Sequence, residues 1–312
     1  MADAKAHEEV KLGRFTIPLS NTGKVLFPGD GITKGDLIRY YQTVAGQMLP
    51  YLKARPVAMA RYPDGITGQR IFQKNVGRHF PDWIPRTEVD KQGGELCQVI
   101  CEKPADLVYL ANQACIELHP FLSQVGALHQ PDQLIFDLDP PDDDHFPQIR
   151  EVSLRLRDIL EDGLGLTAYV KTTGSKGLHV QVALTPQEDF DAVREFAHQV
   201  AERLVADRPE LVSIEQRKDA RGGHIYADIM RNAYAQTAAA PYSVRARPGA
   251  PVAAPLHWAE IEDDTLTARR FTVRNIDARL ADLEKSGDPW AGMSRHRAGL
   301  AKARRLLAQQ AR

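Results

Sequence analysis

The chain has 312 residues, of which 26% are charged, and its formal net charge is −1. No apolar run approaches the roughly 20 residues that cross a bilayer, and the N-terminal stretch MADAKAHEEVK lacks the apolar centre of a signal peptide. We therefore expect a cytoplasmic protein without a membrane segment. The cysteines, Cys97, Cys101 and Cys115, lack paired spacing, which favours reduced, mostly buried thiols over a zinc site or disulfides.

The first half of the chain alternates helical and extended patterns. Apolar residues recur at helical spacing over residues 31–52, where Thr33 stands three residues before Asp36 as a plausible helix cap. Further along we expect a strand over residues 56–63, a strand followed by a long loop over 70–85, and a helix within 107–122 that ends near Pro120.

The second half shows the same irregular alternation. The expected elements are a strand over 134–139, a helix over 146–166 closed by glycines, a strand, loop and strand over 167–184, a helix over 190–207, a strand over 223–230 and a C-terminal helix from about Met293 to Arg312. This order predicts α+β or α/β packing around mixed sheets. We expect one domain over residues 1–312, with residues 1–10 as a flexible tail.

The stretch LIFDLDPPDDD, residues 134–144, places five aspartates behind a short apolar run. Asp137 and Asp139 lie two residues apart on the expected strand, so their carboxylates project to the same side. Two like charges held together repel each other, and a divalent cation offsets that repulsion. We therefore interpret this pair as a metal site. Asp142, Asp143 and Asp144 follow two prolines and are expected in an exposed acidic turn.

A second chemical signal is the segment YVKTTGSKGLHVQV, residues 169–182, which places a turn between two strand patterns. Gly174 and Gly177 allow backbone amides to approach an anion, Ser175 adds a hydroxyl donor and Lys176 adds a full charge. Such a turn is suited to a triphosphate. It is not a P-loop, because the GxxxxGK[ST] spacing is absent and a strand follows.

The third signal lies in the segment from GHIYADIM to PYSVRARPGAP. Asp228 stands within an apolar strand pattern, where an unpaired carboxylate would be costly, so it needs a metal or an arginine partner. Arg231 follows three residues later, and Arg245 lies in a turn made rigid by prolines and a glycine. Three aspartates, an anion-binding turn and two arginines together indicate two-metal phosphoryl transfer.

The net charge of −1 argues against a nucleic-acid binder, but the distribution of charge does not. A phosphate polymer responds to local clusters of positive charge rather than to the sum. Basic residues crowd one stretch that has few acids: Arg217, Lys218, Arg221, Arg231, Arg245 and Arg247. Because such clusters are often solvated faces, this feature alone decides nothing.

The motifs DLDP, TTGSKGLHV and DIMRNAYAQTAAAPYSVRARPGAPV resemble the three signature regions of the archaeo-eukaryotic primase superfamily. The form they resemble is the polymerase domain of bacterial ligase D. The similarity extends to KVLFPGDGITKGDLIRYY and ANQACIELHPFLS, so it spans nearly the whole chain. It implies an α+β fold with two β-sheets flanked by helices, in a stand-alone primase-polymerase or an excised polymerase domain.

The resemblance also implies roles for individual residues. The metal-binding carboxylates correspond to Asp137, Asp139 and Asp228, the triphosphate hairpin to Ser175, Lys176 and His179, and further phosphate contacts to Arg231 and Arg245. His119 corresponds to a reader of the sugar 2′-hydroxyl, Phe72 to an aromatic that stacks on the template, and Lys24 and Lys34 to lysines that hold a downstream 5′-phosphate.

The implied activity is that of a template-directed DNA repair polymerase. It would add nucleotides, preferably ribonucleotides, to primer 3′ ends at short gaps or breaks, with two Mn²⁺ or Mg²⁺ ions. Its partners would be NTP or dNTP, gapped or broken DNA with a 5′-phosphate, and repair proteins such as Ku or a DNA ligase. We expect a monomer in the bacterial cytoplasm, at the nucleoid. End joining and excision-repair gap filling present the same 5′-phosphate, so the sequence does not separate them.

The sequence departs from the family pattern on the template and sugar side. Ala60 precedes Arg61 where relatives often carry two basic residues, and Ile71 stands where many have a second aromatic beside Phe72. The loop NVGRHFPDW lacks the proline-glycine pattern common there. Strand preference and sugar selectivity therefore follow less directly from the resemblance than catalysis does.

Three other classes of protein remain open. A phosphatase of the haloacid-dehalogenase type uses DxD with Thr or Val next but one, whereas Pro140 and Pro141 follow here. A DxD glycosyltransferase also pairs aspartates with Mn²⁺, but no other motif indicates sugar recognition. A non-catalytic module that binds DNA ends or gaps would bind without Asp137 and Asp139 and would never extend a primer.

Overall fold

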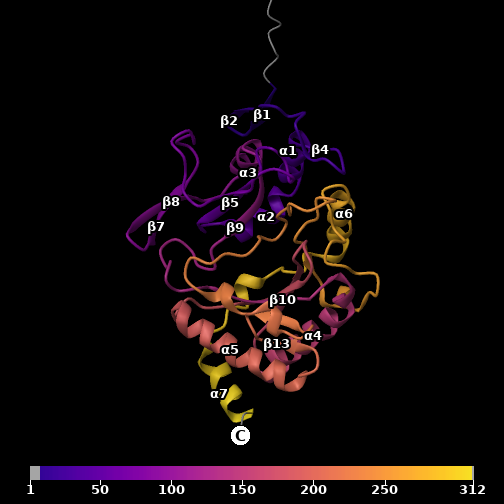
Figure 1. Cartoon of the computed structure of the whole chain (residues 1–312). Helices are drawn as coiled ribbons and strands as arrows, with labels where there is room; N and C mark the ends of the chain where they lie inside the picture. The colour runs from indigo at the N-terminus through magenta and orange to yellow at the C-terminus, as the bar shows by residue number, and fades with distance from the viewer. Residues whose placement is uncertain (1–7, 311–312) are drawn as a thin grey trace, which may run out of the picture.

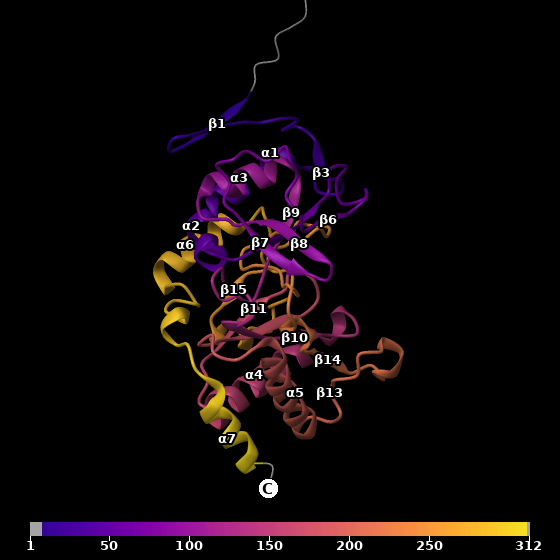
Figure 2. The same ribbon diagram turned by 90° about the vertical axis from the view of Figure 1, so that its left-hand side faces the viewer.

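The computed structural model describes residues 8–310, and in it two β-sheets lie one above the other with helices packed around them (Figure 1). The view turned by 90° shows the same two halves (Figure 2). The upper half in both views holds the N-terminal part of the chain and the lower half holds the sheet that contains β10 (Gln133–Asp139). Buried apolar side chains form one continuous core across both halves.

The upper sheet is antiparallel and has the order β6 (Ile71–Gln73), β5 (Val57–Arg61), β8 (Gly94–Val99) and β7 (Arg86–Lys91), with β9 (Cys115–Pro120) also paired to β5. Two small hairpins precede it: β1 (Glu9–Leu12) with β2 (Phe15–Pro18), and β3 (Val25–Phe27) with β4 (Ile32–Thr33). The helices of this half are α1 (Lys34–Thr43), α2 (Ala45–Leu52) and α3 (Pro104–Asn112).

The lower sheet has six strands in the order β13 (Val212–Ser213), β14 (Ile225–Asp228), β10, β12 (Leu178–Ala183), β11 (Ala168–Thr172) and β15 (Pro255–Leu256). Only the β13–β14 pair among them is parallel. Its helices are α4 (Phe146–Asp158), which continues as a π-helical turn over Ile159–Gly163, and α5 (Phe190–Asp207). The C-terminal part adds α6 (Ile276–Ser286) and α7 (Leu300–Gln310).

Local sequence signals explain several of these elements. Thr33 caps α1 through a reciprocal capping box with Asp36, as expected from their spacing. Asp189 accepts a hydrogen bond from the Ala192 amide and caps α5, whose buried residues recur every three or four positions. The expected helix over 190–207 and the strands around residues 134–139 and 167–184 are confirmed. The mixed α+β fold with two main sheets is confirmed as well.

Two expectations about the elements need correction. The helix within 107–122 ends at Asn112, and Cys115–Pro120 forms strand β9, because the chain reverses at Ala114 (φ 56°) and then pairs with β5. The C-terminal helix begins at Leu300, and Met293–Arg295 is only a short 3₁₀ helix. The helical pattern over 31–52 is confirmed and is divided between α1 and α2.

The expected tail over residues 1–10 falls largely outside the described residues, but Glu9 and Val10 belong to β1. Helix α6 was not expected from the sequence. No helix within residues 8–310 is long and apolar enough to cross a membrane. Cys97, Cys101 and Cys115 are free thiols, and the last two are buried, as expected.

Candidate active site

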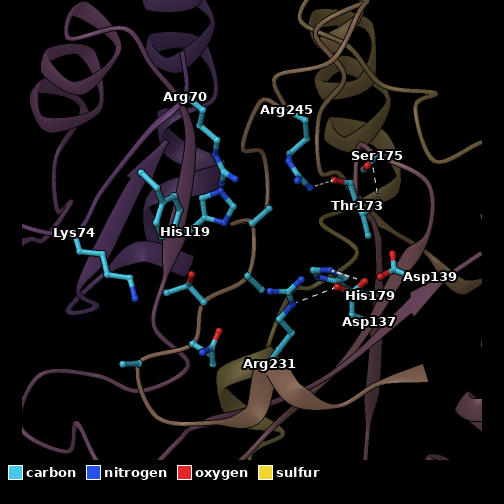
Figure 3. Close-up of a pocket in the computed structure, with 16 residues that line it drawn as sticks. Arg70, Lys74, His119, Asp137, Asp139, Thr173, Ser175, His179, Arg231 and Arg245 are labelled. Atoms are coloured by element: carbon cyan, nitrogen blue, oxygen red, sulfur yellow. Dashed lines mark hydrogen bonds and ion pairs between the residues drawn. The ribbon is translucent and has the colours of Figure 1, made fainter. Parts of the chain in front are cut away.

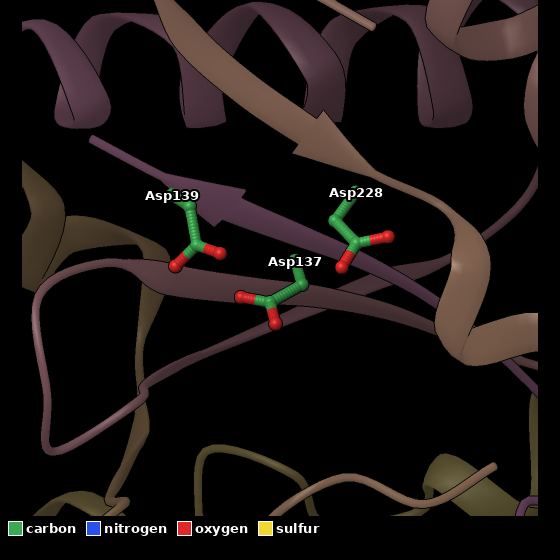
Figure 4. Close-up of side chains that lie close together, drawn as sticks. All are labelled: Asp137, Asp139 and Asp228. Atoms are coloured by element: carbon green, nitrogen blue, oxygen red, sulfur yellow. The ribbon is translucent and has the colours of Figure 1, made fainter. Parts of the chain in front are cut away.

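The register of the lower sheet aligns four polar side chains in one row. Asp137 on β10 pairs with Asp228 on β14 and, on its other side, with His179 on β12, which in turn pairs with Lys171 on β11. Directly paired residues of an antiparallel ladder project from the same face, and Asp139, two residues from Asp137, shares that face. Figure 4 shows the carboxylates of Asp137, Asp139 and Asp228 converging. One oxygen of each lies within 4.8 Å of the others.

The three carboxylates have different electrostatic surroundings. Burial and the charges of Asp137 and Asp228 raise the pKa of Asp139 to about 7. Burial and Asp137 also raise the pKa of Asp228. Burial would raise the pKa of Asp137 too, but His179, Arg231 and Lys171 together lower it below its ordinary value. The raised pKa values of Asp139 and Asp228 reflect repulsion among the three carboxylates, which a bound cation would offset.

The donor set fits divalent cations. Asp137 Oδ1 is buried and makes no hydrogen bond within the described residues, although His179 Nε2 lies 3.3 Å away. Hard cations such as Mg²⁺ and Mn²⁺ prefer carboxylate oxygens. The unpaired oxygen and the mutual repulsion of the aspartates are both relieved when such ions bind. Asp137, Asp139 and Asp228 are therefore the residues that would hold them, as the sequence predicted.

The hairpin between β11 and β12 is shaped by packing as well as by its anion-binding groups. A Cβ on Gly177 would lie 1.8 Å from the carbonyl oxygen of Leu138, and a Cβ on Gly174 (φ +63°) would lie 2.7 Å from Cγ of Arg245. The glycines thus let the turn approach β10 and Arg245. The amides of Ser175 and Gly177 donate to Thr173 Oγ1 at 3.1 and 3.2 Å, so they are engaged within the turn.

A cavity of about 530 Å³ lies between the two halves of the molecule and contains most of the expected site residues (Figure 3). Its lining comprises Arg70, Phe72, Lys74, His119, Asp137, Asp139, Thr173, Ser175, His179, Arg231, Arg245 and the segment Ala235–Ala239. The sheet around β5 thus contributes Phe72 and His119, and the sheet around β10 contributes the carboxylates. Four arginine and lysine side chains beside carboxylates suit a ligand that carries phosphates and metal ions.

The two arginines expected from the sequence contact both sides of the cavity. Arg231 Nε lies 3.5 Å from Asp137 Oδ2 and 3.9 Å from Asp228 Oδ2. Arg245 donates to the Thr173 carbonyl at 2.7 Å and to Glu117 at 3.2 Å. Arg245 therefore joins the glycine hairpin to the upper sheet.

Phe72 lies on the edge strand β6 and is 41% exposed. Its ring lies edge-on to His119 with centroids 5.6 Å apart, and the Arg70 guanidinium lies 4.9 Å from its centroid. The ring lines the cavity, and its exposed part is available to stack on a flat partner beside Arg70.

Four expected residues lie outside the cavity lining. One of them, Asp228, lies beside it, with an oxygen within 4.8 Å of oxygens of Asp137 and Asp139. Lys176 is partly exposed on the hairpin. Lys24 is exposed, and its Nζ lies 2.8 Å from Asp64 Oδ1. Lys34 is buried, and its Nζ donates to Ser20 Oγ and to the Asn112 carbonyl at 3.1 Å each.

Lys24 and Lys34 are nevertheless neighbours, because the Lys34 amide donates to the Lys24 carbonyl at 2.8 Å. Burial and the positive charge of Lys24 lower the pKa of Lys34. The two charges therefore lie close enough to repel each other. The aspartates at 142–144 are exposed beside the site, as expected, and one of them, Asp143, pairs with Arg269, which donates to the Ser175 carbonyl.

Sequence reasoning missed several residues of the site. Glu117 is buried between His119 and Arg245, and Arg70 and Lys74 flank Phe72 on the cavity wall. The signal for Glu117 was its place two residues before His119, which puts both on one face of a strand. Reading that segment as helical concealed the relation.

Comparisons with known proteins identify the family to which the chain belongs. The family model described as LigD, primase-polymerase domain, matches residues 33–290. The chain therefore belongs to the LigD primase-polymerase domain family. It is 33% identical to a solved structure described as the polymerase domain from Mycobacterium tuberculosis ligase D in complex with DNA, with a TM-score of 0.81 over 89% of this chain and 97% of that one.

Curated relatives are longer proteins. The chain is 34% identical over 273 residues to the multifunctional non-homologous end joining DNA repair protein LigD of Mycobacterium tuberculosis, covering 85% of this chain and 36% of the relative. It is 31% identical over 290 residues to the multifunctional LigD of Pseudomonas aeruginosa (93% and 34%) and 32% identical over 276 residues to the bifunctional LigD of Bacillus subtilis (88% and 43%). The chain thus spans well under half the length of these relatives.

Proposed function

We propose that this chain is a template-directed DNA repair polymerase that extends primer 3′ ends at short gaps or breaks. The observation that carries the proposal is the convergence of Asp137, Asp139 and Asp228 at a cavity that also holds Arg231 and Arg245. Carboxylates for cations beside donors for phosphates are the requirements of nucleotidyl transfer. The relatives' names, which refer to DNA repair by end joining, support the same activity.

The aspartates would hold two Mn²⁺ or Mg²⁺ ions. When bound, such ions lower the pKa of the primer 3′-hydroxyl and offset the charge of the triphosphate. Arg231 and Arg245 would pair with phosphate oxygens, and the Ser175 hydroxyl and Lys176 would add donors from the hairpin. Burial lowers the pKa of His179 to about 4, so at neutral pH its ring acts as an uncharged hydrogen-bonding group.

The upper sheet would receive the template and the sugar. The exposed ring of Phe72 suits stacking on a template base, which tolerates any sequence. His119 lies across the cavity from the carboxylates and would read the sugar 2′-hydroxyl (Figure 3). This supports a preference for ribonucleotides. Lys24 and Lys34 would hold the 5′-phosphate of the downstream strand.

A primer-extension assay tests the proposal. The substrate is a duplex with a short gap and a downstream 5′-phosphate, supplied with NTP or dNTP in parallel and with Mn²⁺ or Mg²⁺. We expect templated additions and release of pyrophosphate by the wild type. Tight binding to the gap without any extension would instead identify a non-catalytic module, and template-independent release of phosphate from an ester would identify a phosphatase.

A further inference from the structure

Strand β9 presents two polar side chains to the cavity wall. Glu117 and His119 lie two residues apart on this strand and therefore share a face. Their direct partners on β5 are Ala60 and Ala58, which are fully buried and carry no polar group. The small neighbours leave Glu117 and His119 in contact with each other rather than with the adjacent strand.

Glu117 accepts hydrogen bonds from three directions although it is only 5% exposed. His119 Nε2 lies 3.0 Å from its Oε2, while Arg245 Nε and the Ala246 amide lie 3.2 and 3.0 Å from its Oε1. The Arg70 guanidinium approaches Oε2 at 3.7 Å. Burial opposes the charge of Glu117, but these partners lower its pKa below the ordinary value, so it stays ionised.

An ionised carboxylate only accepts hydrogen bonds, so Nε2 of His119 must carry the proton that it donates. Burial lowers the pKa of His119, and the charges of Arg245 and Arg70 act in the same direction against the opposing effect of Glu117, so the ring is uncharged at neutral pH. A neutral imidazole protonated on Nε2 has an acceptor at Nδ1. The ring lines the cavity, and Nδ1 makes no hydrogen bond within the part of the chain that is described.

We propose that Glu117 is a positioning residue that fixes His119 with Nδ1 as a hydrogen-bond acceptor, so that the site selects nucleotides whose 2′ substituent donates a hydrogen bond. This inference rests on the proposed polymerase function and specifies how its sugar selectivity arises. A ribose 2′-hydroxyl donates to Nδ1. A 2′-fluorine or a 2′-hydrogen cannot do so, although fluorine is close to the hydroxyl in size.

The test compares Glu117→Gln with the wild type. Arg245 and the Ala246 amide are both donors, so the carbonyl oxygen of the glutamine stays hydrogen-bonded to them. Its NH₂ group then faces His119 Nε2. Nε2 must become the acceptor, and the proton moves to Nδ1. The substitution keeps the size of the side chain at position 117. It changes His119 Nδ1, the ring nitrogen proposed to face the sugar, from a hydrogen-bond acceptor into a donor.

Steady-state incorporation of one nucleotide gives the first measurement, as kcat/KM for the 2′-hydroxyl, 2′-fluoro and 2′-deoxy forms of the same triphosphate. We expect the wild type to favour hydroxyl over fluoro, and Glu117→Gln to lower that ratio at least about tenfold, the effect of one buried hydrogen bond. Glu260→Gln is the matched control. Glu260 also pairs with an arginine, Arg279, and accepts from a backbone amide, that of His257, but it lies away from the cavity, so the ratio should not change.

The second measurement does not depend on activity. Nitrogen-15 NMR of the full chain with labelled histidine reports which ring nitrogen of His119 carries the proton, with His119→Gln assigning the signal. We expect protonated Nε2 in the wild type and protonated Nδ1 in Glu117→Gln. Protonated Nδ1 in the wild type, or an unchanged hydroxyl-to-fluoro ratio in Glu117→Gln, would overturn the inference. A wild type that incorporates no nucleotide would refute the polymerase function, while the NMR result would still decide the role of Glu117.

Discussion

The two halves of the molecule hold their functional residues in different ways. In the lower sheet, strand register alone brings Asp137, Asp228 and His179 into one row, because paired residues face the same side. In the upper half, Lys24 lies on the loop before β3 and Lys34 at the start of α1, and side chains from distant segments contact both of them. The groups proposed for catalysis are thus fixed by the sheet, whereas those proposed for the downstream DNA depend on contacts between separate segments.

This difference predicts that the largest losses of primer extension follow from substitutions in the row that Asp137, Asp228 and His179 form in the lower sheet. Asp137→Asn keeps the side-chain size but removes a charge needed for cations, so primer extension should fall by roughly 10³-fold or more. DNA binding should persist or strengthen, because one repulsive carboxylate is lost. Single-turnover extension and a binding titration measure the two effects. Asp142→Asn, in the exposed turn, is the control and should behave as the wild type, and near-normal extension by Asp137→Asn would refute the metal site.

Substitutions of the residues proposed to bind the triphosphate should have the next largest effect. His179→Ala and Arg245→Ala each remove a cavity-lining donor and should slow incorporation by about 10²- to 10³-fold, corresponding to roughly 2.7–4 kcal/mol. Ser175→Ala should act in the same direction. Lys176→Ala should cost less, because Lys176 does not line the cavity. Equal losses for Lys176 and Arg245 in kcat/KM for the triphosphate would show that the hairpin closes on the nucleotide.

The raised pKa of Asp139, about 7, predicts a pH dependence of cation binding. Protons compete with Mn²⁺ for this carboxylate, so affinity should rise about tenfold from pH 5.5 to 6.5 and level off above pH 8. In the metal-free protein, the contribution of Asp139 to folding stability changes with pH in the opposite direction to the cation affinity. A carboxyl with a folded pKa above its unfolded value stabilises the fold at acidic pH, and this contribution is lost as pH rises from about 4 through 7.

Calorimetric titration of Mn²⁺ across this range measures the affinity. Asp139→Asn serves as the comparison, because it removes the titrating group and should flatten the dependence. A wild-type affinity that does not vary between pH 5.5 and 8 would contradict the clustering of the three carboxylates.

The smallest effect should come from Lys24 and Lys34. A downstream 5′-phosphate should tighten binding to gapped DNA several-fold at low salt, and Lys24→Ala/Lys34→Ala should lose that increment. Because Lys34 is buried, Lys24→Ala alone is the cleaner variant. Asp64→Asn should increase the preference by releasing Lys24 from its ion pair.

The control for this prediction is the same gap with a 5′-hydroxyl, to which all variants should bind alike. Fluorescence anisotropy at two salt concentrations measures the increment, which should shrink as salt rises. If the wild type shows no preference for the phosphate, Lys24 and Lys34 are structural residues and the preference for gaps needs another origin. The polymerase assignment would be unaffected.

The site could be read from sequence where short motifs coincide with strand geometry. Asp137 and Asp139 needed only the alternation of a strand, and Asp228 needed only the rule that buried charges have partners. The capping of α1 and the full extent of α5 were equally local. Each of these predictions used interactions between residues a few positions apart, which the sequence displays directly.

Tertiary structure decided the features that depend on distant partners. Residues 115–120 form β9 because β5 offers backbone groups for pairing, and only this strand places Glu117 between His119 and Arg245. In the same way, Lys34 is buried because Ser20 and Asn112 surround its amino group. A sequence reveals which side chains are present and how they repeat along the chain. Which of them meet across more than a hundred residues, as Glu117 and Arg245 do, is determined by long-range pairing that no local pattern encodes.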